Sequence, residues 1–314
     1  MSNVIADPSA LPVLTTAMAR RGLGVYLVVV AALSLPLYVG MIRTDAFAGQ
    51  KMGVAWLAPF MVVPTAASVV ARVVLLEGFA DLSRNRSTPG SRRMTRRAVL
   101  LPVVVGTPAY AVAAAAGLIT VDVPATGVWI TLVLANLVMN VVLVSGEELG
   151  WRGYMVPQLV ASGAPAPLVV GGLIWGAWHV PLYLWAGIVE NGPDPALQTV
   201  LLLALTAALG YVLGRLQLVT ATVWAPVALH VAWNVFLQTV LDPLATGADK
   251  YVWVGEVGLL TVGATVLVAI AYARRPWGMA IPTADPGGAT GPARSTGEAP
   301  STSAHPLHRR QAQS

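Results

Sequence analysis

The stretch VWITLVLANLVMNVVLVSGEELGWRGY, residues 128–154, decides the class of fold. Its first part, residues 128–144, is almost wholly apolar and approaches the roughly 20 residues that a helix needs to cross a bilayer. Glu147, Glu148 and Arg152 follow directly. Charged side chains at the edge of a predicted membrane helix are either ordinary interfacial charges or members of a reaction site.

The whole chain has the composition of a membrane protein. Of its 314 residues, 56% are hydrophobic and 11% are charged, whereas about 25% of the residues of a soluble domain are charged. The chain contains no cysteine, which excludes disulfides, cysteine nucleophiles and cysteine metal sites. The composition therefore predicts an all-α, multi-pass transmembrane helical bundle.

Apolar segments divide the chain into about eight predicted spans. They lie at residues 22–42, 53–76, 98–119, 127–146, 167–187, 198–214, 221–241 and 252–273. We expect residues 1–21 to be an N-terminal lead and residues 22–275 to form one membrane-embedded domain, with its motifs within residues 127–241. Residues 276–314 are rich in Pro, Gly, Ser, Thr and Ala, and we expect a disordered cytoplasmic tail because they cannot bury enough apolar surface.

The basic residues are unequally divided between the two ends of the predicted spans. One side carries most of the arginines, namely Arg20, Arg21, Arg84, Arg86, Arg92, Arg93, Arg96, Arg97, Arg152, Arg215, Arg274 and Arg275. The other side has only Arg43, Lys51 and Lys250. The positive-inside rule then predicts a cell-membrane protein with both termini in the cytoplasm and the 145–154 stretch at the cytoplasmic end of its span. It also explains the net charge of +5 without a nucleic-acid partner.

The two neighbouring glutamates differ in their expected surroundings. Glu148 and Arg152 are four residues apart, in the acid-first order that favours an ion pair on a helix. Glu147 lies about 100° further round the helix and has no partner in this pattern. It is either a solvated interfacial carboxylate or a carboxylate in a low-dielectric cavity that accepts a proton from water.

Further polar side chains lie inside predicted spans, where they are costly. His179 lies in the fifth span, one turn after Trp175, and His230 lies in the seventh, one turn before Asn234. Each has a plain interpretation as a hydrogen-bonded residue that joins helices. In the fourth span, Asn136 and Asn140 either bond between helices, which we favour, or line a wet cavity.

Taken together, these residues suit one kind of chemistry. A glutamate and a histidine can activate water, and a histidine with an asparagine can hold a developing oxyanion. The combination predicts hydrolysis of an acyl bond, most plausibly a peptide bond, at a site that faces the cytoplasm. The chain has neither a G-x-S-x-G elbow nor an H-E-x-x-H zinc motif.

At these residues the chain resembles the CAAX-prenyl-protease and bacteriocin-processing family of intramembrane endopeptidases. The family pattern is E-E-x-x-x-R, then F-x-x-x-H, then H-x-x-x-N or H-x-x-x-D, each on a transmembrane helix. The corresponding segments here are Glu147–Arg152, Trp175–His179 and His230–Asn234. The chain departs from the pattern in one place, because the phenylalanine of the family is Trp175.

The resemblance implies a role for each matched residue. Glu147 would be the general base, with His179 beside it on the attacking water, and His230 with Asn234 would form the oxyanion hole. Glu148 and Arg152 would support the geometry as an ion pair, and Trp175 would cover the histidine.

No cofactor is favoured, although zinc remains an alternative, with Glu147, His179 and His230 as three ligands and an open fourth position. The implied substrate is a peptide or a membrane-anchored protein in the lipid bilayer, prenylated in some members of the family.

Two other functions remain open at this point. A non-catalytic immunity or scaffold protein on the same fold would need the helices but not the chemistry of Glu147. A transporter would need a polar path to both faces, whereas the polar residues here gather on one side, and the sequence shows no convincing internal repeat.

Overall fold

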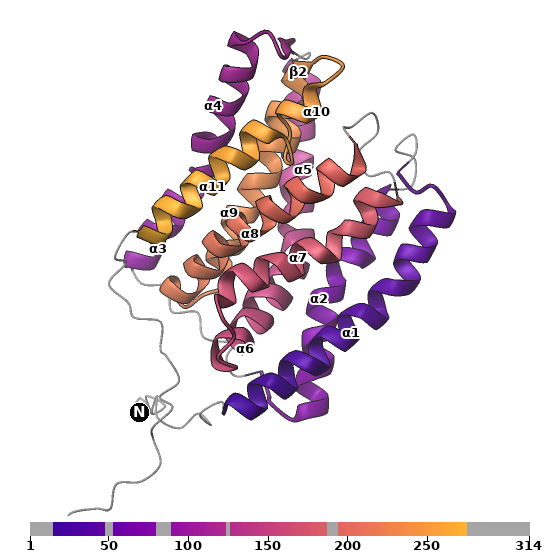
Figure 1. Ribbon diagram of the computed structural model, residues 1–314, viewed down its shortest axis with the longest axis vertical. Helices are drawn as coiled ribbons and strands as arrows, with labels where there is room; N and C mark the ends of the chain where they lie inside the picture. The colour runs from indigo at the N-terminus through magenta and orange to yellow at the C-terminus, as the bar shows by residue number, and fades with distance from the viewer. Residues whose placement is uncertain (1–14, 48–52, 80–88, 124–125, 187–193, 275–314) are drawn as a thin grey trace, which may run out of the picture. The chain divides into compact units, whose positions relative to one another are not determined.

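Helices make up nearly all of the part of the chain that the structure describes (Figure 1). This computed structural model describes residues 15–47, 53–79, 89–123, 126–186 and 194–274. They lie within one structural unit, Met1–Ala284. The predicted tail, residues 276–314, lies outside the described residues, and so do most of the predicted lead and the predicted cytoplasmic positions of Arg84, Arg86 and Arg275.

The described part of the chain contains a series of α-helices. In chain order they are α1 (Thr16–Arg43), α2 (Gly53–Leu75), α3 (Pro89–Ala98), α4 (Leu101–Ala115), α5 (Thr126–Gly150), α6 (Val156–Ala161), α7 (Pro167–Leu184), α8 (Pro195–Thr220), α9 (Trp224–Asn234), α10 (Lys250–Trp253) and α11 (Leu259–Arg274). Two antiparallel strands of two residues each, β1 (Thr120–Val121) and β2 (Ala245–Thr246), pair Thr120 with Thr246.

The prediction of an all-α, multi-pass bundle is confirmed. Seven helical segments of the described chain are long and apolar enough to cross a membrane. The eighth predicted span, residues 252–273, is shorter than expected, because α10 is a separate turn and α11 begins only at Leu259. Gly255, with a φ of +83°, turns the chain between them.

Glycines allow the central helices to approach closely. A Cβ atom placed on Gly172 of α7 would lie 2.3 Å from the carbonyl oxygen of Thr206 in α8, and one on Gly210 would lie 2.6 Å from Cα of Gly172. Close approach of this kind drives helix association in lipid, where burial of apolar surface contributes little. The outer faces of the helices are apolar instead, as Val138 and Leu267 show, each 69% exposed.

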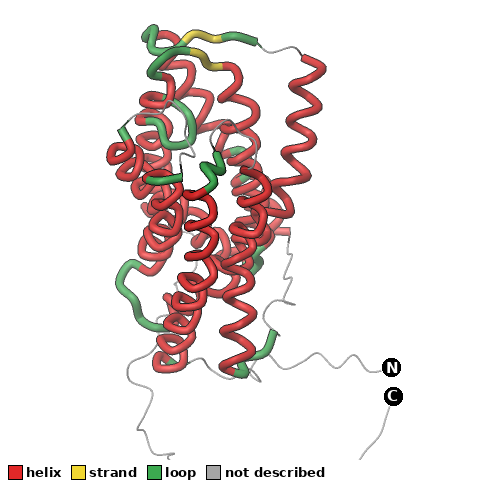
Figure 2. The backbone as a smooth tube through the Cα atoms, turned by 90° about the vertical axis from the view of Figure 1, so that its right-hand side faces the viewer, coloured by secondary structure: helices red, strands yellow, loops and turns green. Residues whose placement is uncertain are grey.

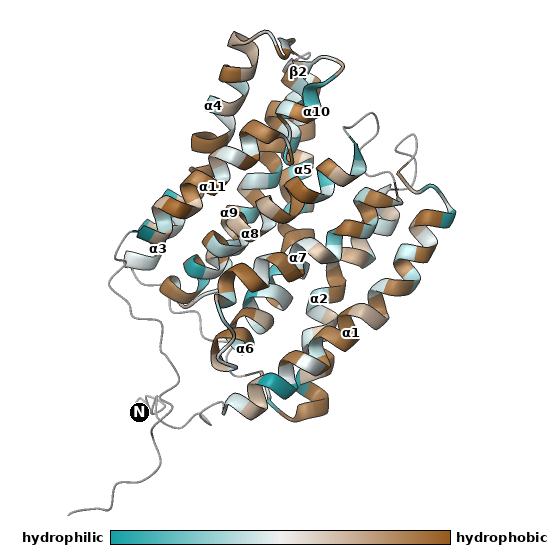
Figure 3. Ribbon diagram, in the orientation of Figure 1, coloured by the Kyte–Doolittle hydropathy of each residue, from teal (hydrophilic) through white to brown (hydrophobic). Residues whose placement is uncertain are grey.

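The two ends of the bundle differ in charge and structure. The "strand end" consists of β1, β2 and α10, and Figure 2 shows both strands together at one end of the helices. The "arginine end" consists of α3, the start of α1, the end of α11 and the start of α9, which packs against α3. Hydrophilic residues gather towards the ends of the helices and apolar residues fill the lengths between them (Figure 3).

Candidate active site

The helix that carries both glutamates continues well beyond its predicted end. The span was expected to stop near residue 146, but α5 runs to Gly150, a π-helical turn covers Trp151–Met155, and α6 continues to Ala161. The EELGWR motif therefore lies within a helical segment, and all three charged residues are buried, with exposed fractions of 2% or less. Their first interpretation, as ordinary interfacial charges, does not hold.

Two glycines place this part of α5 against α2. A Cβ atom on Gly150 would lie 2.2 Å from the backbone carbon of Pro64, and one on Gly146 would lie 2.8 Å from the carbonyl oxygen of Met61. The hydroxyl of Thr65 donates to the carbonyl oxygen of Gly146 at 2.5 Å. The contact turns the side chains that follow Gly146 towards the interior of the bundle.

Glu147 is buried and held by two indole groups. Its Oε2 accepts a hydrogen bond of 2.7 Å from Nε1 of Trp175 and one of 3.3 Å from Nε1 of Trp151. The prediction that Glu147 has no local partner was wrong, because Trp151 lies four residues further along the same helical segment. Both donors are neutral, so they solvate the carboxylate without neutralising its charge.

Glu148 joins two helices through one oxygen. Its Oε1 lies 2.6 Å from Nη1 of Arg152 and 2.8 Å from Nδ1 of His230. The ion pair with Arg152 was predicted from the spacing of four residues and is present. The contact with His230 was not predicted, and it links α5 to α9 within the protein interior.

The ring of Trp175 lies at the centre of the site. It lies edge-to-face with His230 and with His179, at centroid distances of 5.2 and 5.9 Å. The guanidinium of Arg152 lies 4.4 Å from its centroid, a distance that suits a cation–π contact. Trp175 thus touches or approaches every charged or titratable group of the three motifs except Glu148.

His179 is oriented by the backbone of its own helix. Its Nδ1 lies 3.0 Å from the carbonyl oxygen of Trp175. A carbonyl oxygen only accepts, so Nδ1 carries the proton and Nε2 remains as the basic nitrogen of the neutral ring. The structure describes both His179 and Glu147 and shows no direct hydrogen bond between them, which leaves both able to contact a third group.

Asn234 is held by an asparagine on the neighbouring helix. Its Nδ2 donates to Oδ1 of Asn140 at 3.0 Å, and Nδ2 of Asn140 donates to the carbonyl oxygen of Asn136 at 2.9 Å. Asn140 therefore joins α5 to α9, which confirms the predicted bond between helices for this residue. Asn136 bonds within its own helix instead, to the carbonyl oxygen of Leu132. One N–H of the Asn234 amide remains available for a ligand.

A single cavity brings the predicted residues together. Its volume is about 180 Å³, and Glu147, His179, His230 and Asn234 all line it. They come from α5, α7 and α9. The polar lining is completed by Asn136, Asn140, Thr206, Tyr183, Gln238 and Glu256, and the rest of the wall is largely apolar. Both asparagines of α5 therefore face this cavity.

The residues proposed as zinc ligands do not form a metal site in this arrangement. Among the described residues, no three His, Cys, Asp or Glu side chains are grouped closely enough to hold a metal ion. Glu147 uses one oxygen for two indoles, and His230 uses Nδ1 for Glu148. Glu147, His179 and His230 thus share the cavity without converging as three ligands.

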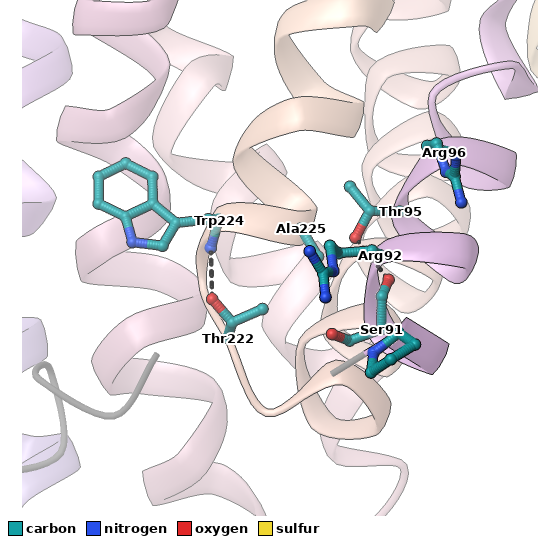
Figure 4. Close-up of a pocket in the computed structure, with 8 residues that line it drawn as sticks. Ser91, Arg92, Thr95, Arg96, Thr222, Trp224 and Ala225 are labelled. Atoms are coloured by element: carbon teal, nitrogen blue, oxygen red, sulfur yellow. Dashed lines mark hydrogen bonds between the residues drawn. The ribbon is translucent and has the colours of Figure 1, made fainter. Parts of the chain in front are cut away.

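A second, larger cavity has different chemistry. It lies at the arginine end, has a volume of about 610 Å³ and is lined by residues of α3 and of the start of α9. Figure 4 shows Arg92 and Arg96 on successive turns of α3, and Thr222 accepting a hydrogen bond from the backbone N–H of Trp224. The described residues that line this cavity include no carboxylate or histidine, so they provide no base for hydrolysis.

Several residues of the site were missed in the sequence. Trp151 follows Glu147 by four residues, a spacing that would have revealed it if indole N–H groups had been included as donors. No sequence pattern indicated three other residues of the cavity wall, Thr206, Gln238 and Glu256. They belong to no motif, and only the packing of the bundle brings them to the cavity.

Comparison with known proteins agrees with the motifs. No curated protein matches the chain. Residues 126–236 match the family model "Type II CAAX prenyl endopeptidase Rce1-like". The matched segment begins with α5 and extends just past α9, so it holds all three motifs and every residue predicted to be catalytic. The match supports the resemblance to CAAX-type intramembrane proteases that the three motifs indicate, and it covers this segment of the chain only.

Proposed function

We propose that this protein is an intramembrane endopeptidase that hydrolyses a peptide bond of a membrane-associated or CAAX-like substrate with a glutamate as general base. One observation carries the proposal: Glu147, His179, His230 and Asn234, from three helices, line a single cavity. A catalytic group must lie within reach of the substrate, and a shared cavity is the arrangement that permits this.

In the proposed reaction, a water molecule is activated between Glu147 and His179. The free Oε1 of Glu147 and Nε2 of His179 are its acceptors, since the other atoms of both groups already have partners. The water oxygen forms a bond to the carbonyl carbon of the peptide as its proton passes to this pair. The C–N bond then breaks, and the same proton goes to the leaving amine.

His230 and Asn234 stabilise the tetrahedral oxyanion. The amide of Asn234 offers the N–H that Asn140 does not use. His230 donates from Nε2 when both of its ring nitrogens are protonated, and the carboxylate of Glu148 beside Nδ1 stabilises that charged ring. Hydrogen bonds prepared in a cavity of low polarity contribute strongly to catalysis.

The cell membrane is the proposed location, with both termini in the cytoplasm. This rests on the unequal distribution of arginine between the two ends of the spans. Residues 22–275 would then form one membrane-embedded domain, with the 276–314 segment as a cytoplasmic tail. The partners are the lipid bilayer and a peptide or membrane-anchored protein.

The test is cleavage of a peptide library by the purified full-length protein in detergent. Glu147→Gln should abolish cleavage and leave thermal unfolding close to that of the unchanged protein, and a strong chelator should have no effect. Loss of activity with the chelator would point to zinc. Full activity of Glu147→Gln would contradict the role of this residue, and a lack of any cleavage would favour an immunity or scaffold role.

A further inference from the structure

The catalytic cavity has a buried end and an open end. Along α9 and the π-helical turn after it, exposure rises from His230 (3%) through Asn234 (7%) to Gln238, which is exposed. Along α5, it rises in the same direction from Glu147 (1%) through Asn140 (7%) to Asn136, which is half-buried. All of these residues line the cavity. The reacting groups therefore lie at its base, and its mouth lies near Gln238.

This mouth lies towards the strand end of the bundle. Both Asn136 and Gln238 are on the side of the catalytic groups that leads to β1 and β2, because α5 begins after β1 and α9 leads towards β2. The arginine end is at the opposite ends of the same helices. The lining of the cavity therefore favours access from the arginine-poor side, whereas the distribution of arginines predicts a site that faces the cytoplasm.

A carboxylate lies at this mouth that no motif includes. Glu256, between α10 and α11, lines the cavity and is half-buried. Its Oε1 accepts a 3.1 Å hydrogen bond from Nε1 of Trp233, and its Oε2 accepts a 2.8 Å bond from Nε2 of Gln238. The two donors fix the carboxylate against the end of α9 and the π-helical turn that follows it, in the wall of the same cavity as Asn234.

The charge of Glu256 is not compensated by the residues around it. Glu148 has an arginine and a histidine, whereas the hydrogen-bond donors to Glu256 are an indole and an amide. Within the described part of the chain, no Lys, Arg or His forms an ion pair with Glu256. Its oxygens each have remaining capacity to accept a hydrogen bond.

The surroundings of the mouth are acidic as well. The described residues near this end of the spans include the carboxylates of Asp45, Asp122, Asp194, Asp242 and Asp249, against the basic side chains of Arg43 and Lys250. The ammonium group of Lys250 is already bonded to the carbonyl oxygens of Asp242 and Ala245. A field of one sign at the mouth of a cleft attracts ligands of the opposite sign.

We infer that Glu256 is a specificity subsite that binds a cationic group of the peptide substrate, which enters the cavity from the strand end. The inference rests on the proposed peptidase function and adds the substrate class and the direction of access. The ligand is a lysine or arginine side chain or a free α-ammonium group, because each brings both a positive charge and N–H donors to the carboxylate.

The geometry also sets the position of the cationic residue. Gln238, which holds Glu256, comes eight residues after His230, which corresponds to roughly 12 Å along a helix. An extended peptide covers roughly 3.3–3.6 Å per residue. The cationic residue should therefore lie about three or four residues from the bond that is cleaved.

The first experiment uses the full-length protein in detergent and peptides of one cleavable sequence. A single lysine is placed in turn at each position on either side of the scissile bond, and each peptide is paired with its norleucine analogue. We expect lysine to raise kcat/KM about tenfold at a position three or four residues away, mainly through KM. Equal cleavage of every lysine and norleucine pair would overturn the inference.

Variants then assign the effect to this carboxylate. Glu256→Gln should remove the preference for lysine, so that each lysine peptide is cleaved no faster than its own norleucine analogue. Glu256→Lys should reverse the preference in favour of glutamate at the same position. Asp249→Asn is the matched control, because Asp249 is an exposed carboxylate of the strand end that does not line the cavity. A lysine preference that persists in Glu256→Gln would overturn the assignment.

Glu147→Gln separates this inference from the proposed function. If Glu147→Gln abolishes cleavage while Glu256→Gln does not affect lysine preference, the peptidase function stands and the subsite is wrong. If Glu147→Gln cleaves normally, the proposed chemistry is wrong, whatever the lysine preference. Peptide substitution on the unchanged protein needs no variant, so misfolding of Glu256→Lys does not prevent the test.

The direction of access has its own measurement, because the chain contains no cysteine. Ala248→Cys at the strand end and Arg93→Cys at the arginine end are both exposed positions. In intact cells, a membrane-impermeant maleimide should label Ala248→Cys and should label Arg93→Cys only after the cells are opened. The reverse pattern would place the strand end in the cytoplasm and would overturn access from the non-cytoplasmic side of the membrane.

Discussion

The indole Nε1 of Trp175 donates a 2.7 Å hydrogen bond to Oε2 of Glu147, a carboxylate that is only 1% exposed. The two adjacent glutamates of the motif therefore differ in kind. Glu148 shares one oxygen with a guanidinium and an imidazole, whereas one oxygen of Glu147 accepts from two neutral indoles. The other oxygen of Glu147 is left to receive a proton, which is why we assign the chemistry to this residue.

The first prediction concerns Trp175, which replaces the phenylalanine of the family pattern. Trp175→Phe removes the short N–H donor while an aromatic ring still packs beside His179 and His230. We expect kcat to fall about tenfold, because a hydrogen bond to a charged group contributes roughly 1.5–3 kcal/mol and Glu147 loses its better donor. Steady-state cleavage of a single peptide by the purified protein provides the measurement.

Trp151→Phe is the matched control for this change. It removes the same indole from the same carboxylate, but its hydrogen bond is 3.3 Å long and weaker. The effect on kcat should be clearly smaller than that of Trp175→Phe. Equal effects of the two variants would show that Trp175 acts through packing alone.

The second prediction concerns the buried ion pair. Glu148→Gln should destabilise the protein by about 3–5 kcal/mol, because it leaves the charge of Arg152 buried without a counter-charge. The double variant Glu148→Leu with Arg152→Met should recover most of this stability, since it removes both charges. Thermal unfolding in one detergent measures the difference.

Activity should not follow stability in this pair of variants. The double variant leaves Nδ1 of His230 without its carboxylate, so cleavage should remain low although the fold is restored. Recovery of both stability and activity would mean that Glu148 has only a structural role and that its contact with His230 is incidental.

The sequence predicted contacts within a single helix better than it predicted contacts between helices. The pairing of Glu148 with Arg152 follows from a spacing of four residues, and the structure confirms it. The contact of Glu148 with His230 joins residues that are 82 positions apart, and helical periodicity contains no information on such a distance. Only the order of the three motifs, recognised as a family pattern, indicated that these helices meet.

Helix boundaries were the weaker part of the fold prediction. The charges of the EELGWR stretch predict the end of a span, yet the helical segment continues to Ala161. Polarity marks the end of a membrane helix only when the polar side chains face water, and these face the interior. Glu256 was missed for a related reason, since it reaches the cavity from a connection between helices that has no periodic pattern.

The third prediction concerns the contact between α5 and α2. Gly150→Ala places a Cβ atom where the structure leaves 2.2 Å to the backbone of Pro64, so one helix must move. We expect a loss of about 1–3 kcal/mol in the free energy of unfolding and a fall in kcat, because Glu147 moves with α5. Circular dichroism during heating and the peptide assay together provide the measurement.

Gly127→Ala makes the same chemical change near the start of the same helix. Nothing lies within 4 Å of a Cβ atom at this position, so the variant should be as stable as the unchanged protein or slightly more stable. A similar loss of stability in both variants would show that the contact with Pro64 is not tight.

The fourth prediction concerns two asparagines with different roles. Asn234 would donate a hydrogen bond to the oxyanion, and Asn140 would orient Asn234. Asn234→Leu should lower kcat by about 10²–10³ with little change in KM, the effect expected when an oxyanion donor is removed. Asn234→Asp should retain part of the activity, since the family pattern accepts aspartate at this position. Both variants are compared in the peptide assay after their thermal unfolding has been checked.

Asn140→Leu tests the positioning role. Asn140 accepts the 3.0 Å hydrogen bond that orients the Asn234 amide, so its loss should leave the donor present but less well aimed. We therefore expect a smaller fall in kcat than for Asn234→Leu, about tenfold. The double variant should be no less active than Asn234→Leu alone, because Asn140 acts through Asn234. A further fall in the double variant would mean that Asn140 contacts the substrate itself, as its place in the cavity wall allows.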